Sequence, residues 1–164
     1  MKAYKEDSTT PIYKANKCVV VGGGNVAMDA ARSAKRLGAD VTIVYRRSME
    51  ELPARHEEVE HAMEEGIKFQ LLTNPVKVLG QDGWVSGVEC VEMELGEPDA
   101  SGRRRPIVKE GSNFVIECDC MIMSIGTSPN PLIRSTTEGL ETNRKGCLVV
   151  DENGMTTRAG VFAG

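Results

Sequence analysis

The sequence predicts an α/β fold: a Rossmann-like parallel sheet with helices on both faces and an inserted antiparallel β-meander. Three observations lead to this expectation. A β-branched run at residues 19–21 leads into a glycine turn, and a helical and then an extended pattern follow over residues 25–45. Short alternating segments broken by turn residues occupy residues 76–118. At 164 residues, the chain is long enough for one domain with its own core.

The first strand joins a helix through a glycine turn of the pattern Gly22-x-Gly24-x-x-Ala27. Gly22 permits a tight turn, Gly24 lets the backbone approach a phosphate without a Cβ in the way, and Ala27 keeps the helix close to the sheet. The free N–H groups and positive end of the helix would face the anion. The turn predicts a dinucleotide site with these residues around the pyrophosphate: Gly22, Gly23, Gly24, Asn25, Val26 and Ala27.

The segments around the turn complete one βαβ unit. Residues 25–37 carry a stripe of mostly small apolar residues at helical spacing, and Gly38 follows as a helix-ending residue. Residues 41–45 have the pattern of a second strand, and the connection should be right-handed. The alternative is a βαβ unit whose glycine turn binds nothing. The full context favours a dinucleotide site.

Two arginines indicate which dinucleotide binds. NAD-binding versions place an Asp or Glu about 20 residues past the glycines to bind the ribose hydroxyls. Here the second strand ends in Arg46 and Arg47, with no carboxylate before Glu50. A guanidinium can bind a 2′-phosphate through paired, charge-assisted hydrogen bonds. We therefore expect NADP rather than NAD, with Arg55 as a further candidate for the same phosphate; the alternative is an ordinary solvated basic pair.

Composition argues against several classes of partner. The net charge of −4 and the pI near 5.3 argue against nucleic acid. No segment approaches the roughly 18 apolar residues of a membrane span, and no signal-peptide pattern is present. Five scattered cysteines are typical of reduced thiols, so we expect a cytoplasmic protein. The one basic cluster, residues 103–105, is interpreted as a solvated hairpin tip.

The two histidines do not predict a metal site. His56 and His61 are five residues apart, which points them in different directions around a helix. Residues 53–65 are instead expected to form an acidic, solvent-facing helix, with Pro53 near its start and Gly66 at its end. No metal ligands are predicted.

The second half of the chain changes pattern. Residues 67–72 are expected to form a third parallel strand, and residues 76–118 an antiparallel meander with one solvated face. Residues 120–125 are expected to be the next buried strand, which ends in a glycine loop. Because open α/β sheets bind ligands at the carboxyl ends of their strands, we expect Gly126 and Thr127 beside the nicotinamide half of the cofactor. The alternative is a plain strand-to-loop turn.

Several motifs together resemble a known family. Residues 20–32, the strand end at residues 45–48 and the helix from residue 53 to residue 66 resemble the NADPH-binding domain of the glutamate synthase small (beta) subunit. Related flavoprotein reductases, including the electron-entry portion of dihydropyrimidine dehydrogenase, share this domain. Residues 125–130, 146–151 and 157–164 also match. Position 127 is Thr, where the family leads us to expect Gln or another larger polar residue.

The resemblance implies that the chain is part of a longer flavoprotein. Family members carry an FAD domain split in sequence, with the NADPH domain inserted into it. Residues 1–16 would then be a linker from the flavin domain, residues 17–145 the NADPH-binding Rossmann-like domain, and residues 146–164 the return segment. FAD and iron–sulfur clusters are expected only in the full-length enzyme. The implied partners are the flavin domain of the same polypeptide and a large catalytic subunit.

The resemblance also implies an NADPH-dependent oxidoreductase that positions NADPH for hydride transfer to FAD, with onward transfer to iron–sulfur clusters. No catalytic side chain is predicted, because nicotinamide and flavin carry the chemistry, and the chain alone is expected to bind NADPH without turnover. One alternative is a stand-alone NADP(H)-binding regulatory module without flavin chemistry. A self-contained short-chain dehydrogenase would need a Tyr-x-x-x-Lys pair, and the only match, Tyr13 and Lys17, precedes the glycine turn.

Overall fold

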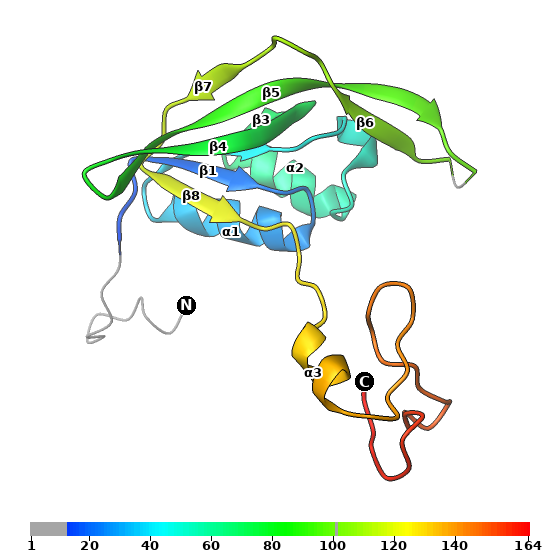
Figure 1. Cartoon of the computed structure of the whole chain (residues 1–164). Coiled ribbons are helices and arrows are strands. Elements are labelled where there is room, and N and C mark those ends of the chain that lie inside the picture. The colour runs from blue at the N-terminus through cyan, green and yellow to red at the C-terminus, as the bar shows by residue number, and fades with distance from the viewer. Residues whose placement is uncertain (1–12, 101) are drawn as a thin grey trace. The chain divides into compact units, whose positions relative to one another are not determined.

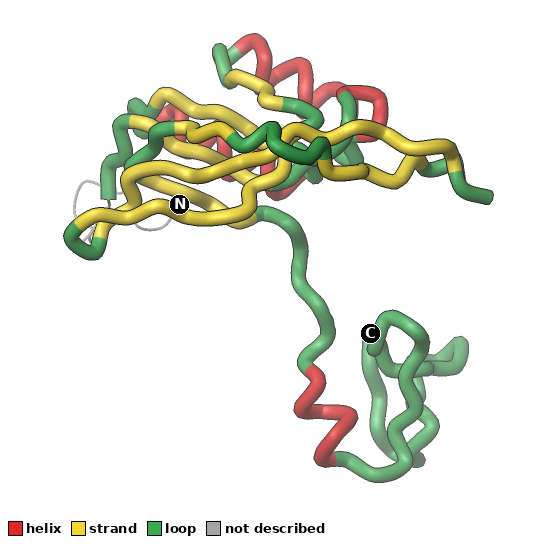
Figure 2. The backbone as a smooth tube through the Cα atoms, turned by 45° about the horizontal axis from the view of Figure 1, so that its top comes forward, coloured by secondary structure: helices red, strands yellow, loops and turns green. Residues whose placement is uncertain are grey.

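The computed structural model describes residues 13–100 and 102–164. The chain divides into two compact units, Met1–Ile125 and Gly126–Gly164. The described residues of the first unit form two sheets and two α-helices, whereas the second unit consists mostly of turns (Figures 1 and 2). Of the expected linker at residues 1–16, residues 1–12 lie outside the described part of the chain.

The parallel sheet has four strands in the order β3-β2-β1-β8. Their bounds are Lys68–Gln70 for β3, Asp40–Val44 for β2, Lys17–Val21 for β1 and Cys120–Met123 for β8. Val20 of β1 lies opposite Ile43 of β2 and Ile122 of β8, and every pairing is parallel. Strand β1 has a neighbour on each side and a covered face above and below, which is why its sequence is a nearly continuous valine run.

Helices α1 (Asn25–Arg36) and α2 (His56–Glu64) cover one face of the parallel sheet (Figure 1). They bury small or medium side chains against Val20 and its neighbours in one core cluster; these side chains are Ala27, Met28, Ala31, Val59 and Ala62. The helix expected at residues 53–65 begins later, at His56, so Pro53 precedes it. It is also not wholly solvent-facing, because its Val59 side packs on the sheet.

The predicted meander is confirmed as a separate antiparallel sheet. Strands β4 (Thr73–Gln81), β5 (Trp84–Pro98) and β6 (Arg104–Val108) pair in this order, and β7 (Phe114–Ile116) pairs with β5. Asp82 and Gly83, which join β4 to β5, have φ values of 52° and 83°. A two-residue hairpin turn needs positive φ at both positions, so this dipeptide fixes the register of the hairpin.

The Rossmann-like parallel sheet and its inserted meander are confirmed, but the predicted helices on both faces are wrong for one face. There Val88 and Cys90 of β5 pack with Val19, Val21 and Val44, so the antiparallel sheet takes the place of helices (Figure 1). The physical reason is handedness. From β1 the chain adds β2 and then β3 toward one edge of the sheet. From β3 it returns past β2 and β1 to place β8 at the other edge. A right-handed return must cross the opposite face, and the connecting segment is the meander.

The second unit contains one short helix, α3 (Pro131–Thr136), followed by turns. Asn130 caps this helix by accepting a hydrogen bond from the Leu132 N–H at 3.0 Å. Among the described residues of this unit, Thr156 is the only buried one. The expected boundary at residue 146, with a return segment toward a flavin domain beyond it, stays a prediction. None of the described helices is long and apolar enough to cross a membrane.

Candidate functional site

The glycine turn lies at the carboxyl edge of the parallel sheet, where strands β1 and β8 adjoin. Strand β1 connects to β2 over the helical face, whereas β8 is reached over the opposite face, so the strand order reverses between them. Open α/β sheets bind ligands beyond the carboxyl ends of the strands at such a switch point. The Ser124 N–H, just after β8, donates to the Val21 carbonyl at 2.8 Å and fixes the two strand ends together.

The three glycines of the turn differ in their surroundings. Gly22 has φ of +138°, and a Cβ there would collide with the Ser124 carbonyl. A Cβ on Gly23 would lie 2.7 Å from the Tyr45 ring. A Cβ on Gly24, in contrast, would meet nothing within 4 Å. The fold itself therefore requires Gly22 and Gly23, whereas the missing side chain of Gly24 leaves open space beside the start of α1.

The start of α1 presents unpaired donors to this space. Gly24 is the N-cap residue, no side chain caps the helix, and its first turn has no acidic residue. The Gly24 carbonyl accepts from the Ala27 N–H at 2.9 Å. The N–H groups of Gly24, Asn25 and Val26 donate to no other residue in the described part of the chain. Such a helix start, with its partial positive charge, suits an anion such as a pyrophosphate.

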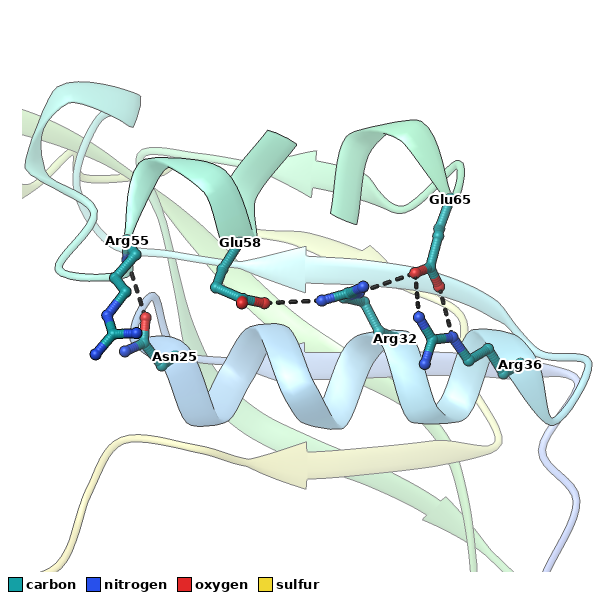
Figure 3. Close-up of polar contacts among 6 residues, drawn as sticks. All are labelled: Asn25, Arg32, Arg36, Arg55, Glu58 and Glu65. Atoms are coloured by element: carbon teal, nitrogen blue, oxygen red, sulfur yellow. Dashed lines mark hydrogen bonds and ion pairs between the residues drawn. The ribbon is translucent and has the colours of Figure 1, made fainter. Parts of the chain in front are cut away.

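Asn25 ties the glycine turn to the start of α2. Its side-chain oxygen accepts a hydrogen bond from the Arg55 N–H at 2.9 Å (Figure 3). The Ala54 N–H donates to the Gly23 carbonyl at 3.0 Å. Together these bonds bring the Arg55 backbone beside the glycine turn. The Asn25 side-chain oxygen therefore holds Arg55 in place.

An ion-pair network holds α2 along the length of α1. Arg32 contacts Glu58 at 2.7 Å and Glu65 at 2.9 Å, and Arg36 also binds Glu65 (Figure 3). Hydrogen bonds from Arg36 and Arg32 hold the pKa of Glu65 below its usual value. The network fixes the start of α2, and with it Arg55, relative to the glycine turn.

Arg46 and Arg47 directly follow Tyr45 at the end of β2. Arg46 is exposed, whereas Arg47 is partly buried and its Nε is a buried donor without an acceptor in the described part of the chain. Neither guanidinium forms an ion pair with another described residue. The Leu72 N–H donates to the Arg47 carbonyl at 3.0 Å, which fixes the backbone of the pair. Neither guanidinium is therefore neutralised by a carboxylate among the described residues.

The interpretation of residues 103–105 as a solvated hairpin tip is wrong for Arg104. Its Nε lies 3.0 Å from Glu51 Oε1, and its Nη2 lies 3.5 Å from Glu50 Oε2. Both carboxylates belong to a 3-10 helix, η2 (Met49–Glu51), that follows the arginine pair. Sequence reasoning missed this contact because more than fifty residues separate its partners. The Ser48-x-x-Glu51 capping box in η2 could have been recognised.

Gly126 and Thr127 are the first residues of the second unit, and both are exposed. Gly126 has φ of +88°, and a Cβ there would meet nothing within 4 Å. Their expected position beside the nicotinamide stays a prediction.

The parallel sheet with a glycine turn at its switch point is the architecture of a nucleotide-binding, Rossmann-type oxidoreductase domain. Comparison with known families agrees with this class. The chain belongs to the pyridine nucleotide-disulphide oxidoreductase family, whose sequence profile matches residues 2–164.

The chain matches parts of longer relatives within this class. The chain is 43% identical over 157 residues to the beta subunit of NADP(+)-dependent formate dehydrogenase from Moorella thermoacetica, covering 94% of this chain and 22% of the relative. It is 40% identical over 156 residues to the small chain of glutamate synthase [NADPH] from Halomonas elongata, covering 92% and 33%. The predicted resemblance to that small subunit is confirmed. The chain spans a fifth to a third of the length of these relatives.

A solved structure supports the fold. The thioredoxin reductase of Lactococcus lactis matches with a TM-score of 0.73 at 23% identity, covering 92% of this chain and 44% of that one. At this identity the likeness concerns the architecture only.

Proposed function

We propose that this chain binds NADPH and presents it to a flavin held elsewhere in a longer protein. The observation that carries the proposal is the open space at Gly24, faced by the unpaired N–H groups at the start of α1. This space lies at the switch point of the sheet. The names of the two relatives, which include NADP(+) and NADPH, agree with it.

In this proposal the N–H groups of Gly24, Asn25 and Val26 bind the pyrophosphate. Arg46 and Arg47 bind the 2′-phosphate, because their guanidinium groups are free of carboxylate partners in the described part of the chain. A charge-assisted hydrogen bond contributes about 1.5–3 kcal/mol, so two arginines would favour NADPH over NADH by roughly a hundredfold or more.

Three further residues complete the proposed site. Arg55, whose backbone N–H is bound by the Asn25 side chain, is proposed to bind the same 2′-phosphate as Arg46 and Arg47. Gly126 and Thr127 are proposed to contact the nicotinamide half. Gly22, Gly23 and Ala27 shape the turn and are not proposed to bind through side chains.

Bound NADPH supplies the hydride that the flavin accepts, so this chain needs no side-chain acid or nucleophile. Its residues bind the dinucleotide and orient it. FAD and iron–sulfur clusters are proposed only for the full-length enzyme. The proposed partners are the flavin domain of the same polypeptide and a large catalytic subunit, and the partial coverage of the relatives supports such a larger assembly.

The test is the Arg46→Ala/Arg47→Ala variant, with dissociation constants for NADPH and NADH measured by calorimetry. We expect NADPH binding to weaken by roughly a hundredfold and NADH binding to change little, because only NADPH carries the 2′-phosphate. A Lys14→Ala/Lys77→Ala variant, which removes two exposed positive charges elsewhere in the first unit, is the control. Equal losses for both cofactors would refute the assignment of the arginines. A wild-type chain that binds neither cofactor would refute the proposed function.

A further inference from the structure

We propose that Arg104, on the antiparallel sheet, is a positioning residue that sets the preference for NADPH. It binds Glu50 and Glu51 and thereby keeps two carboxylates away from the arginine pair. This inference rests on the proposed function, in which Arg46 and Arg47 bind the 2′-phosphate.

The contact between Arg104 and Glu51 is part of a partly shielded cluster. Glu51 Oε1 lies 3.0 Å from Arg104 Nε, and Glu51 Oε2 accepts hydrogen bonds from the Ser48 N–H at 3.2 Å and its hydroxyl at 3.0 Å. The Glu51 side chain is 17% exposed and that of Arg104 37%. Solvent and salt screen such a pair less than a fully exposed one.

Glu51 carries its negative charge at neutral pH. Partial burial raises the pKa of this carboxyl, but the hydrogen bonds from Ser48 and the charge and hydrogen bond of Arg104 outweigh it, so the pKa lies below its usual value. Arg104 is therefore the cation that compensates a carboxylate close to the proposed phosphate site.

The cluster is connected to the glycine turn through Tyr45. The Tyr45 ring packs against Gly23, and its hydroxyl donates to the Glu51 carbonyl at 2.8 Å. Arg46 and Arg47 lie in the short segment between Tyr45 and Ser48. This segment is thus held at one end by the tyrosine and at the other by the Ser48–Glu51 cap.

Without Arg104, the carboxylates of Glu50 and Glu51 would have no cationic partner on β6. Either could then bind Arg46 or Arg47 and compete with the 2′-phosphate, or repel the phosphate directly. A free carboxylate after this strand is also what NAD-binding folds use to bind ribose hydroxyls. Loss of Arg104 should therefore weaken NADPH binding and leave NADH binding unchanged or slightly tighter. A purely structural role would weaken both cofactors alike.

The experiment measures dissociation constants for NADPH and NADH in four variants, with circular dichroism to confirm folding. Arg104→Ala is expected to weaken NADPH binding roughly tenfold without weakening NADH binding. Arg105→Ala, which removes the exposed neighbouring arginine, should change neither. Arg104→Ala/Glu50→Gln/Glu51→Gln should restore NADPH binding, because the competing charges are gone. Arg104→Lys, which retains the charge, should keep most of the preference.

Several results would overturn the inference. One is an unchanged preference for NADPH over NADH in Arg104→Ala. Another is an equal loss of affinity for both cofactors, and the third is a failure of the two glutamine substitutions to restore NADPH binding. Each of these leaves the proposed function intact, provided that the wild-type chain prefers NADPH. A wild-type chain without that preference would refute the assignment of Arg46 and Arg47 itself and this inference with it.

Discussion

The two units of the chain reach their structures by different means. The first unit buries apolar clusters on both faces of its parallel sheet. The second buries no apolar side chain among its described residues and is held by turns, in which Asn143 and Asp151 each accept more than one backbone hydrogen bond. Apolar burial supplies most of the favourable free energy of folding. We therefore expect the unit that carries the glycine turn to be more stable than the unit that carries Gly126.

Hydrogen exchange should show the largest difference between the units. Amide protons of β1 and β2 are expected to exchange only through global unfolding, which costs about 5 kcal/mol or more, a slowing of several thousandfold. Amides of residues 138–164 should exchange with little protection. The hairpin tip at Asp82 and Gly83 serves as a fast-exchanging control within the first unit. Similar protection in both units would show that the second unit has a stability that its burial does not explain.

Alanine substitutions at Gly22 and Gly126 compare a packed with an open glycine. Gly22→Ala should lower the free energy of unfolding by about 3 kcal/mol or more, because backbone strain adds to the collision with the Ser124 carbonyl. Gly126→Ala should cost about 1 kcal/mol, from its positive φ alone. Urea denaturation followed by circular dichroism measures both. Equal costs would contradict the view that packing makes Gly22 indispensable.

Gly24 shares the open surroundings of Gly126 but lies at the proposed phosphate site. Gly24→Ala should change the free energy of unfolding by less than about 1 kcal/mol, since its φ of −89° is ordinary. It should nevertheless weaken NADPH binding by roughly tenfold, because a new methyl group would occupy the proposed space of the pyrophosphate at a cost of about 1–3 kcal/mol. Calorimetry with NADPH tests this. Unchanged affinity would exclude close approach of the cofactor to Gly24.

Acid should weaken the network that holds α2 in the first unit. The pKa of Glu65 is lowered by Arg36 and Arg32, so its carboxylate stabilises the fold above the unfolded value of about 4.3. This stabilisation is lost as the pH falls through the folded value. When the pH is lowered from 6 into the acid range, the free energy of unfolding should therefore fall less in Glu65→Gln than in the wild-type protein. Glu57→Gln, an exposed acid of α2 without an ion pair among the described residues, should leave the profile unchanged.

Local pattern was sufficient for much of the fold. The valine run of β1, the stripe of α1 and the pattern of β2 were all recognised, because each follows from residues close in sequence. The turn residues that break the short alternating segments of residues 76–118 likewise predict the meander. The error about helices on both faces arose because the order of strands, and hence the face that a right-handed return must cross, is not written in any local segment.

The sequence by itself determined the βαβ unit, its glycine turn and the arginine pair after β2, because these features depend on short stretches of backbone and on residue type. Only the tertiary structure decided why each glycine is there. Gly22 is required by the Ser124 carbonyl, just after β8, and Gly23 by the Tyr45 ring, whereas a Cβ on Gly24 would meet nothing within 4 Å. It also decided that Arg104 pairs with Glu50 and Glu51, since the return of the chain over the sheet brings distant residues together.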